Sequence, residues 1–205
     1  ISQQLVAIQR ELNYQTELMR GNSIRTPFFL ARGYILEAQE TTDDASRSRN
    51  LHKACEKLRE TIGAIYGDID VASDDLIRNT KKWLFKDKSA IKRDIRFITQ
   101  DFEVLTVAVG LLAQVADYLG DKACENVALE QYRREMLEFF TEPVCKERAI
   151  SMAQLIHEWC DYTDSNLNCW LKLSERVQRV LSNTTNLIEG RDVIVIALED
   201  RQSGR

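Results

Sequence analysis

Turn-forming residues are scarce in this sequence of 205 residues, which contains only 8 glycines and 2 prolines. Proteins built from strands need a turn about every 8–12 residues, so this composition argues against β-sandwiches and β-barrels. Hydrophobic residues make up 44% and charged residues 29% of the chain, as in ordinary folded proteins. The scarcity of turns therefore predicts an all-α fold.

The chain also lacks a surplus of positive charge and any long apolar run. Its 28 Lys and Arg against 32 Asp and Glu give a net charge of −4, which disfavours nucleic acid as a partner because such binding depends on neutralising phosphates. No stretch reaches the ~18–20 apolar residues that a membrane-spanning helix needs, and the start does not resemble a signal peptide. We expect a soluble protein.

No Cys-x-x-Cys pair occurs, and the cysteines are odd in number and scattered: Cys55, Cys124, Cys145, Cys160 and Cys169. Scattered cysteines on helices are usually small buried hydrophobic residues, and a disulfide framework needs an even number. We therefore expect a reducing compartment, the cytoplasm. Secretion without a signal peptide is the alternative.

Motifs for metals, cofactors and catalysis are missing. Di-iron helical bundles need Glu-x-x-His pairs, but the residue three positions before His157 is Gln154, and the one before His52 is Arg49. No zinc-finger spacing, no Gly-x-Ser-x-Gly and no glycine-rich phosphate loop occurs. We therefore expect no metal, no cofactor, no catalytic residue and no enzymatic activity. An enzyme whose cleft is assembled from distant residues is the third alternative.

What the sequence does contain is a series of long heptad-like apolar patterns, of which the first begins at residue 1. Its apolar positions are Ile1, Leu5, Ile8, Leu12 and Met19. Steps of mostly 3 and 4 residues place these side chains on one stripe of a helix, which suits a partner helix or a second copy. Since Ile1 is not methionine and the pattern is already running there, we expect a fragment of a longer chain.

Caps and stop residues predict the next helix boundaries. The second helix is predicted to start with Thr26 as its N-cap and Pro27 at its first position. Asp43 or Asp44 caps the third helix, in which we expect a bend near residues 67–73, since Ser73 resembles the start of a new helix. The apolar stripe of the third helix is Leu51, Cys55, Leu58, Ile62, Ile65 and Ile69.

Residues 89–119 carry the clearest pattern of the chain. One stripe holds Ile91, Ile95, Ile98, Phe102, Leu105, Val109, Leu112, Ala116 and Leu119. From residue 104 the opposite face is apolar too, and it holds Val104, Val107, Leu111 and Val115. A helix that is apolar on most sides is surrounded by other helices, so this segment is predicted to be the centre of the bundle.

The last part of the chain predicts a shorter helix, ending at Glu142 because Pro143 follows, and then a long helical segment to about residue 189. The β-branched residues 193–196 make the segment 192–198 strand-like, and it is either a short strand or the beginning of an element that continues beyond the fragment. The predicted fold is thus an elongated bundle of five to six long amphipathic antiparallel helices. Residues 1–190 form one domain, kinked or two-part, and 191–205 form a tail. A single helix over residues 143–189 would be too long for a compact molecule of this mass, so either this helix kinks near residues 164–168 or the molecule is elongated.

Two functions follow from these patterns. The leading hypothesis is a non-enzymatic interaction or scaffolding module that binds a protein partner or a second copy through the stripe of residues 1–19. The alternative is a pore-forming type of protein that acts on anionic membranes. It would dock through a basic aromatic patch and insert residues 104–119. The simpler explanation of the patch is a solvated corner between two helices, and that of residues 104–119 is an ordinary core helix. The patch is Lys81, Lys82, Trp83, Phe85, Lys86, Lys88, Lys92, Arg93 and Arg96.

Overall fold

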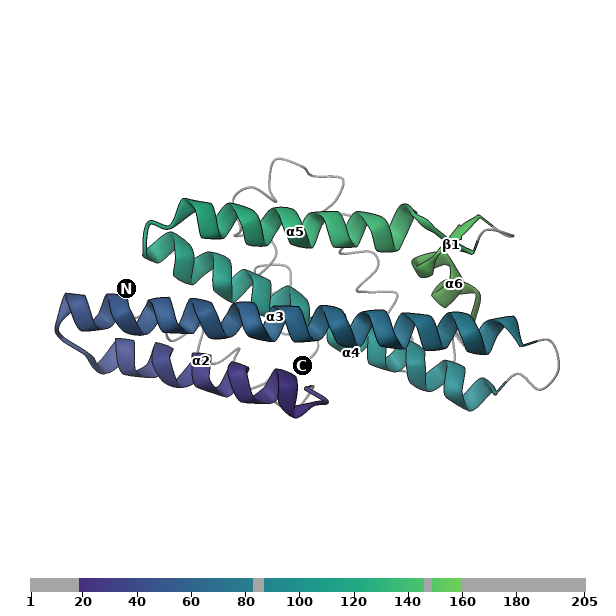
Figure 1. Cartoon of the computed structure of the whole chain (residues 1–205), viewed down its shortest axis with the longest axis horizontal. Coiled ribbons are helices and arrows are strands. Elements are labelled where there is room, and N and C mark those ends of the chain that lie inside the picture. Colours follow the sequence, from purple (N-terminus) through teal and green to yellow (C-terminus); the bar gives the residue numbers. More distant parts are fainter. Residues whose placement is uncertain (1–18, 83–86, 146–148, 160–205) are drawn as a thin grey trace, which may run out of the picture.

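The computed structural model describes residues 19–82, 87–145 and 149–159, which form an elongated antiparallel helical bundle (Figure 1). The elements are α2 (Asn22–Glu40), α3 (Asp44–Lys81), α4 (Lys88–Tyr118), α5 (Lys122–Thr141), β1 (Pro143–Cys145), β2 (Ile150–Ser151) and α6 (Met152–Trp159). Each long helix packs chiefly on its neighbour in sequence: α2 on α3, α3 on α4, and α4 on α5. The predicted all-α bundle is confirmed.

Helix α3 is the longest described element, and its 38 residues run along the long axis of the molecule (Figure 1). Asp43 caps it by accepting a hydrogen bond from the Ser46 amide at 2.8 Å, as predicted. The predicted stripe from Leu51 to Ile69 is buried throughout. The new helix start expected at Ser73 is wrong, because α3 continues without a break to Lys81, and Ala72 and Leu76 continue the same buried stripe.

Helix α2 begins earlier than predicted. Asn22 is its first residue, Gly21 is the N-cap, and Pro27 lies inside the helix rather than at its start. Pro27 has no N–H to donate to the preceding turn. The additional turn nevertheless buries Ile24, which is 1% exposed, beside the fully buried Phe28. We attribute the early start to this burial of apolar surface.

Helix α4 is the centre of the bundle, as predicted. It passes behind α3 and reaches α5 at the other side (Figure 1). Asp87 caps its start by accepting from the amides of Ser89 and Ala90 at 3.0 and 3.1 Å. Residues on both of its predicted apolar faces are buried, and only Leu119 at the end of the stripe is partly exposed. Gly120 terminates the helix with a φ of +71°, which favours glycine.

The segment after Pro143 differs from the prediction. Instead of a helix, β1 and β2 form a small antiparallel sheet in which Pro143 pairs with Ser151. A capping box then starts α6, because the Ser151 Oγ accepts from the Gln154 amide at 3.2 Å and the Gln154 Oε1 accepts from the Ser151 amide at 2.8 Å. The predicted continuation to residue 189 and the strand-like segment 192–198 lie outside the described residues.

Two buried carboxylates interrupt the apolar surface of α4. Asp101 is 2% exposed and accepts hydrogen bonds from Arg20, one of them from Nε at 3.2 Å. The Arg20 guanidinium also lies 3.9 Å from the centre of the Phe97 ring. Asp94, equally buried, accepts from Asn79 Nδ2 at 2.9 Å and from Arg93. These contacts tie α4 to α3 and to the residues that precede α2.

Burial raises the pKa of Asp101 to about 6, although Arg20 opposes the shift. Because this folded pKa lies above the unfolded value, the ionised carboxylate lowers stability above pH 6, and the loss is recovered as the pH falls toward 4. Relative to Asp101→Asn, we expect the wild-type free energy of unfolding to rise by about 2 kcal/mol from pH 7 to pH 4.5. Urea unfolding measures this difference. The assignment is contradicted if the difference in free energy of unfolding between wild type and Asp101→Asn is the same at both pH values. It is also contradicted if the difference between wild type and the surface variant Asp44→Asn changes with pH by an equal amount.

Candidate functional site

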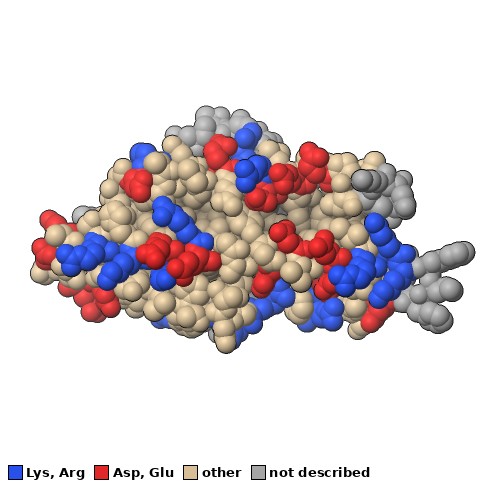
Figure 2. All heavy atoms as spheres, in the orientation of Figure 1, with Lys and Arg blue, Asp and Glu red and all other residues tan. Residues whose placement is uncertain are grey.

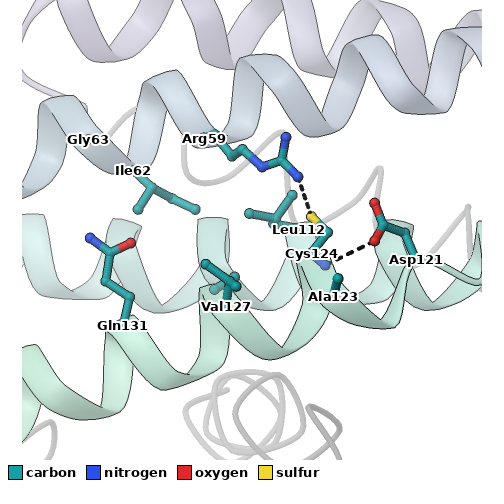
Figure 3. A pocket seen from close by; sticks show the side chains of 10 residues that line it. Arg59, Ile62, Gly63, Leu112, Asp121, Ala123, Cys124, Val127 and Gln131 are labelled. Carbon is teal, nitrogen blue, oxygen red and sulfur yellow. Dashed lines mark hydrogen bonds between the residues drawn. The ribbon is translucent and has the colours of Figure 1, made fainter.

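A groove between α3 and α5 is the candidate site (Figure 3). Both helices pack on α4 and leave an open cavity of about 570 Å³ between them, above the Leu112 side chain. The wall residues on α3 are Arg59, Ile62 and Gly63, and those on α5 and its cap are Asp121, Ala123, Cys124, Val127, Ala128 and Gln131. Gly63 has no neighbouring atom near the position of a Cβ, and this helps to keep the groove open. We call this cavity the α3–α5 groove.

One end of the α3–α5 groove is polar. Arg59 Nη2 donates to Cys124 Sγ at 2.8 Å, so a cation from α3 reaches a thiol on α5. Asp121 caps α5 by accepting from the Cys124 amide at 3.0 Å (Figure 3). Cys124 is thereby held in the first turn of α5.

Cys55 lies behind this polar end, one helical turn before Arg59 on the same face of α3. The Cys55 residue is 5% exposed. Burial, with a smaller effect of Cys124, raises the pKa of Cys55 to about 12. Both cysteines are free and buried, which agrees with the interpretation of their sequence positions as core residues.

Apart from Gln131, the rest of the α3–α5 groove is apolar. Val127 is 67% exposed in its wall, and Ile62 and Leu112 supply buried apolar surface below. An apolar cavity with a few placed polar groups is typical of a binding site. In the described ranges, no three His, Cys, Asp or Glu side chains are grouped so that they could hold a metal ion.

The predicted stripe of residues 1–19 is described at only one position. Met19 is 2% exposed and belongs to the core of the chain. This burial shows that Met19 packs inside the molecule rather than on a free surface. Ile1, Leu5, Ile8 and Leu12 lie outside the described residues, so the use of this stripe stays a prediction.

The predicted basic patch lies at the corner where α3 ends and α4 begins. Its described members are all exposed: Lys81, Lys82, Lys88, Lys92, Arg93 and Arg96. Figure 2 shows Lys and Arg side chains at this end of the molecule, with acidic side chains beside them. Arg93 is paired with Asp94 at 2.9 Å, and the Arg96 guanidinium lies 5.7 Å from the Phe97 ring centre. Trp83, Phe85 and Lys86 lie outside the described residues.

The apolar segment 104–119 of the membrane hypothesis is the buried centre of the bundle. Over the part of the chain that the structure describes, no helix is both long enough and apolar enough to cross a membrane. Searches of protein-family models, of curated proteins and of solved structures found no match to the chain.

Sequence reasoning missed the α3–α5 groove. The periodicity correctly predicted that Ile62 and Leu112 are buried. It gave no reason to expect a gap between two helices that do not follow each other in sequence. The available signals were Gly63 within a helical pattern, which removes a side chain, and Val127, an apolar residue off the buried stripe. Neither signal indicates a cavity without the placement of α5 relative to α3.

The cap that forms the polar end of the groove can be tested directly. We expect Asp121→Ala to lower the free energy of unfolding by about 1 kcal/mol, because the first turn of α5 loses the bond to the Cys124 amide. Asp121→Asn keeps an acceptor and is expected to stay close to wild type. Urea unfolding followed by circular dichroism measures both variants. Equal losses in both would show that the charge of Asp121, not its cap, is what stabilises the helix.

Proposed function

We propose that this chain is a non-enzymatic helical interaction module, and that the α3–α5 groove receives an amphipathic helix from a protein partner. The observation that carries the proposal is the groove itself, where α3 and α5 flank an apolar floor without packing closely on each other. A third helix laid between two aligned helices buries its apolar stripe on both of them and on α4.

The wall residues indicate the chemistry of that partner helix. Val127 and the floor at Leu112 suit aliphatic side chains, and Gly63 allows a close approach of the partner backbone. Arg59 is exposed at the polar end, where an acidic side chain of the partner can pair with its guanidinium. We therefore expect a helix with an apolar stripe and a carboxylate at one end of it.

The groove can be tested with two valines of nearly equal exposure. Val127 in the groove is 67% exposed, and Val71 on the surface of α3, outside the groove residues, is 64% exposed. A photoreactive benzoylphenylalanine is placed at either position, and cross-linked peptides from an extract of the source cells are identified by mass spectrometry. We expect position 127, and not position 71, to capture a helical segment with an apolar stripe.

The captured segment is then synthesised and titrated by fluorescence anisotropy. We expect Val127→Asp to weaken its binding at least roughly tenfold, because a carboxylate is desolvated against the apolar floor, and Val71→Asp to bind as wild type does. Cross-links from 127 to this same chain, with a doubled mass in light scattering, would identify a second copy as the occupant. Equal capture at both positions, or equal binding by both variants, would rule the groove out.

Membrane action is the second candidate function, and the exposed basic corner between α3 and α4 favours it. Six basic side chains of the predicted patch are exposed there. On this proposal they bind anionic headgroups, and residues 104–119 then leave the core to enter the bilayer. The second step exposes the centre of the bundle, so it requires a large rearrangement of α3 and α5 around α4.

Charge reversal distinguishes this candidate from the first. Each basic residue near an anionic surface contributes about 1 kcal/mol, so Lys81→Glu with Lys82→Glu is expected to weaken vesicle binding by at least roughly 30-fold. Arg49→Glu with Lys53→Glu, at the opposite end of α3, is the matched control. Flotation and dye release with phosphatidylserine vesicles measure binding and insertion. A wild-type chain that neither floats nor releases dye excludes membrane action.

A further inference from the structure

We propose that two copies of this chain pair through α2, with the two helices antiparallel and crossing at Gly33. The surface that pairs is one stripe of this helix, which we call the α2 stripe: Arg25, Phe29, Gly33, Leu36 and Glu40. None of its residues lines the α3–α5 groove. The pairing of copies and the partner binding proposed above can therefore fail separately.

The α2 stripe faces away from the bundle. Helix α2 lies at the edge of the molecule, and α3 is its chief partner among the described elements (Figure 1). The residues that α2 buries lie on the side toward α3: Ile24, Pro27, Phe28, Ala31, Ile35 and Ala38. The α2 stripe lies on the opposite side, and its steps of three and four residues keep it on one face. Phe29 is 45% exposed there, and no neighbouring atom lies near the position of a Cβ on Gly33.

The charges of α2 oppose its own helix dipole. Acidic side chains stabilise the N-terminal turn of a helix and basic ones the C-terminal turn, but α2 has no acidic residue in its first turn and no basic residue in its last. Instead, Arg25 lies close to the N-terminus, and Glu40 is the last residue of the helix. Both residues are exposed. This order of charges suits a neighbouring helix that runs in the opposite direction.

A second α2 that lies antiparallel across Gly33 complements this order. Phe29 and Leu36 lie one helical turn on either side of Gly33, and Arg25 and Glu40 lie two turns away from it. In the antiparallel pair, Phe29 of each copy therefore meets Leu36 of the other, and Arg25 of each copy meets Glu40 of the other. The absence of a side chain on Gly33 lets the two backbones come close at the crossing point.

A parallel pair does not fit. It would place Arg25 beside Arg25 and Glu40 beside Glu40, and like charges that face each other across an interface disfavour that arrangement. Antiparallel helices also align their dipoles favourably. Each copy contributes one helix of 19 residues, so the buried area is at the low end for protein complexes. We therefore expect a dimer at high concentration that dissociates on dilution.

The charges are tested by sedimentation equilibrium of the full chain over a range of concentrations. We expect Arg25→Glu and Glu40→Arg each to raise the dissociation constant of the dimer at least roughly tenfold, because two attractions become two repulsions. An equal mixture of the two variants is expected to dimerise as wild type does, since each variant carries the charges that the other lacks. The variant with both substitutions is expected to do the same.

The mixture also controls for contacts inside one chain. Arg25 Nε donates to the Met19 carbonyl at 2.7 Å, so Arg25→Glu removes a bond within the molecule as well as the contact between copies. Mixing with Glu40→Arg restores only the contact between copies. Circular dichroism verifies that each variant is folded. If Arg25→Glu does not fold, Glu40→Arg and the substitutions at the centre of the α2 stripe still decide.

The centre of the α2 stripe is tested by two substitutions in the same assay. Phe29→Asp is expected to raise the dissociation constant at least roughly tenfold, because burial against Leu36 removes the carboxylate from water. Val71→Asp, at an exposed position of α3, is the matched control. Gly33→Gln is expected to weaken the dimer while the monomer becomes more stable to urea, because glutamine is the better helix former. A residue with only a structural role would not give these opposite responses.

Cross-linking locates the contact between the copies. Benzoylphenylalanine replaces Phe29 in a mixture of unlabelled and isotope-labelled chains, and cross-linked peptides are identified by mass spectrometry. We expect pairs of mixed isotope composition, in which position 29 of one copy is joined to the peptide that contains Leu36 of the other.

Three results would overturn the proposal. One is a wild-type chain that stays monomeric at concentrations up to about 1 mM. Another is a mixture of Arg25→Glu and Glu40→Arg that dimerises no better than either variant alone. The third is a dimer that Phe29→Asp leaves unchanged, or whose cross-links from position 29 join residues of one chain only, because such a dimer uses another surface. None of these results bears on the capture of a partner at position 127, which tests the groove.

Discussion

The nearly complete apolar circumference of the second half of α4, residues 104–116, is the constraint on which the rest of the structure depends. A helix that is apolar on most sides cannot remain in water, so it must be covered on opposite faces. Helix α3 covers one face, and α5 covers another, where the Thr106 and Tyr132 hydroxyls hydrogen-bond at 2.9 Å. Because both helices are positioned by α4 rather than by each other, a space is left between them. The α3–α5 groove is thus a product of the way the core is covered.

Buried polar groups fix the position of α4 along the helices that pack on it. Leu and Ile side chains pack acceptably in several neighbouring registers, whereas Asp94 and Asp101 are each satisfied by one set of partners. A shift of α4 by one turn would separate Asp94 from Asn79, although Arg93 on the same helix would stay beside it, and would separate Asp101 from Arg20. Asp101 would then be a buried charge without a partner, which costs several kcal/mol. We therefore regard these two aspartates as determinants of specificity. Their contribution to overall stability is offset by the cost of burying them.

Periodicity and capping signals predicted most of the described helices, because those signals are local. The Asp43 cap, the buried stripe of α3 and the Gly120 terminus all depend on residues within a few turns. The errors arose where packing between elements overrode local preference, as at Pro27 inside α2. The capping box at Ser151 was present in the sequence, but the apolar pattern after Pro143 was assigned to one helix. The groove depends on the relative placement of α3 and α5, which local patterns do not contain.

The packing order of the long helices has a consequence for how the chain acquires its structure. Among the described residues, each long helix packs chiefly on its neighbours in sequence, so the packing joins elements that follow one another along the chain. Helical bundles in which local contacts dominate fold on the order of microseconds to milliseconds. The arrangement also suits folding during synthesis, since α2 and α3 can pair before α5 has left the ribosome. Helix α4, which has the most buried residues of the described helices, then emerges with a partner already formed to receive it.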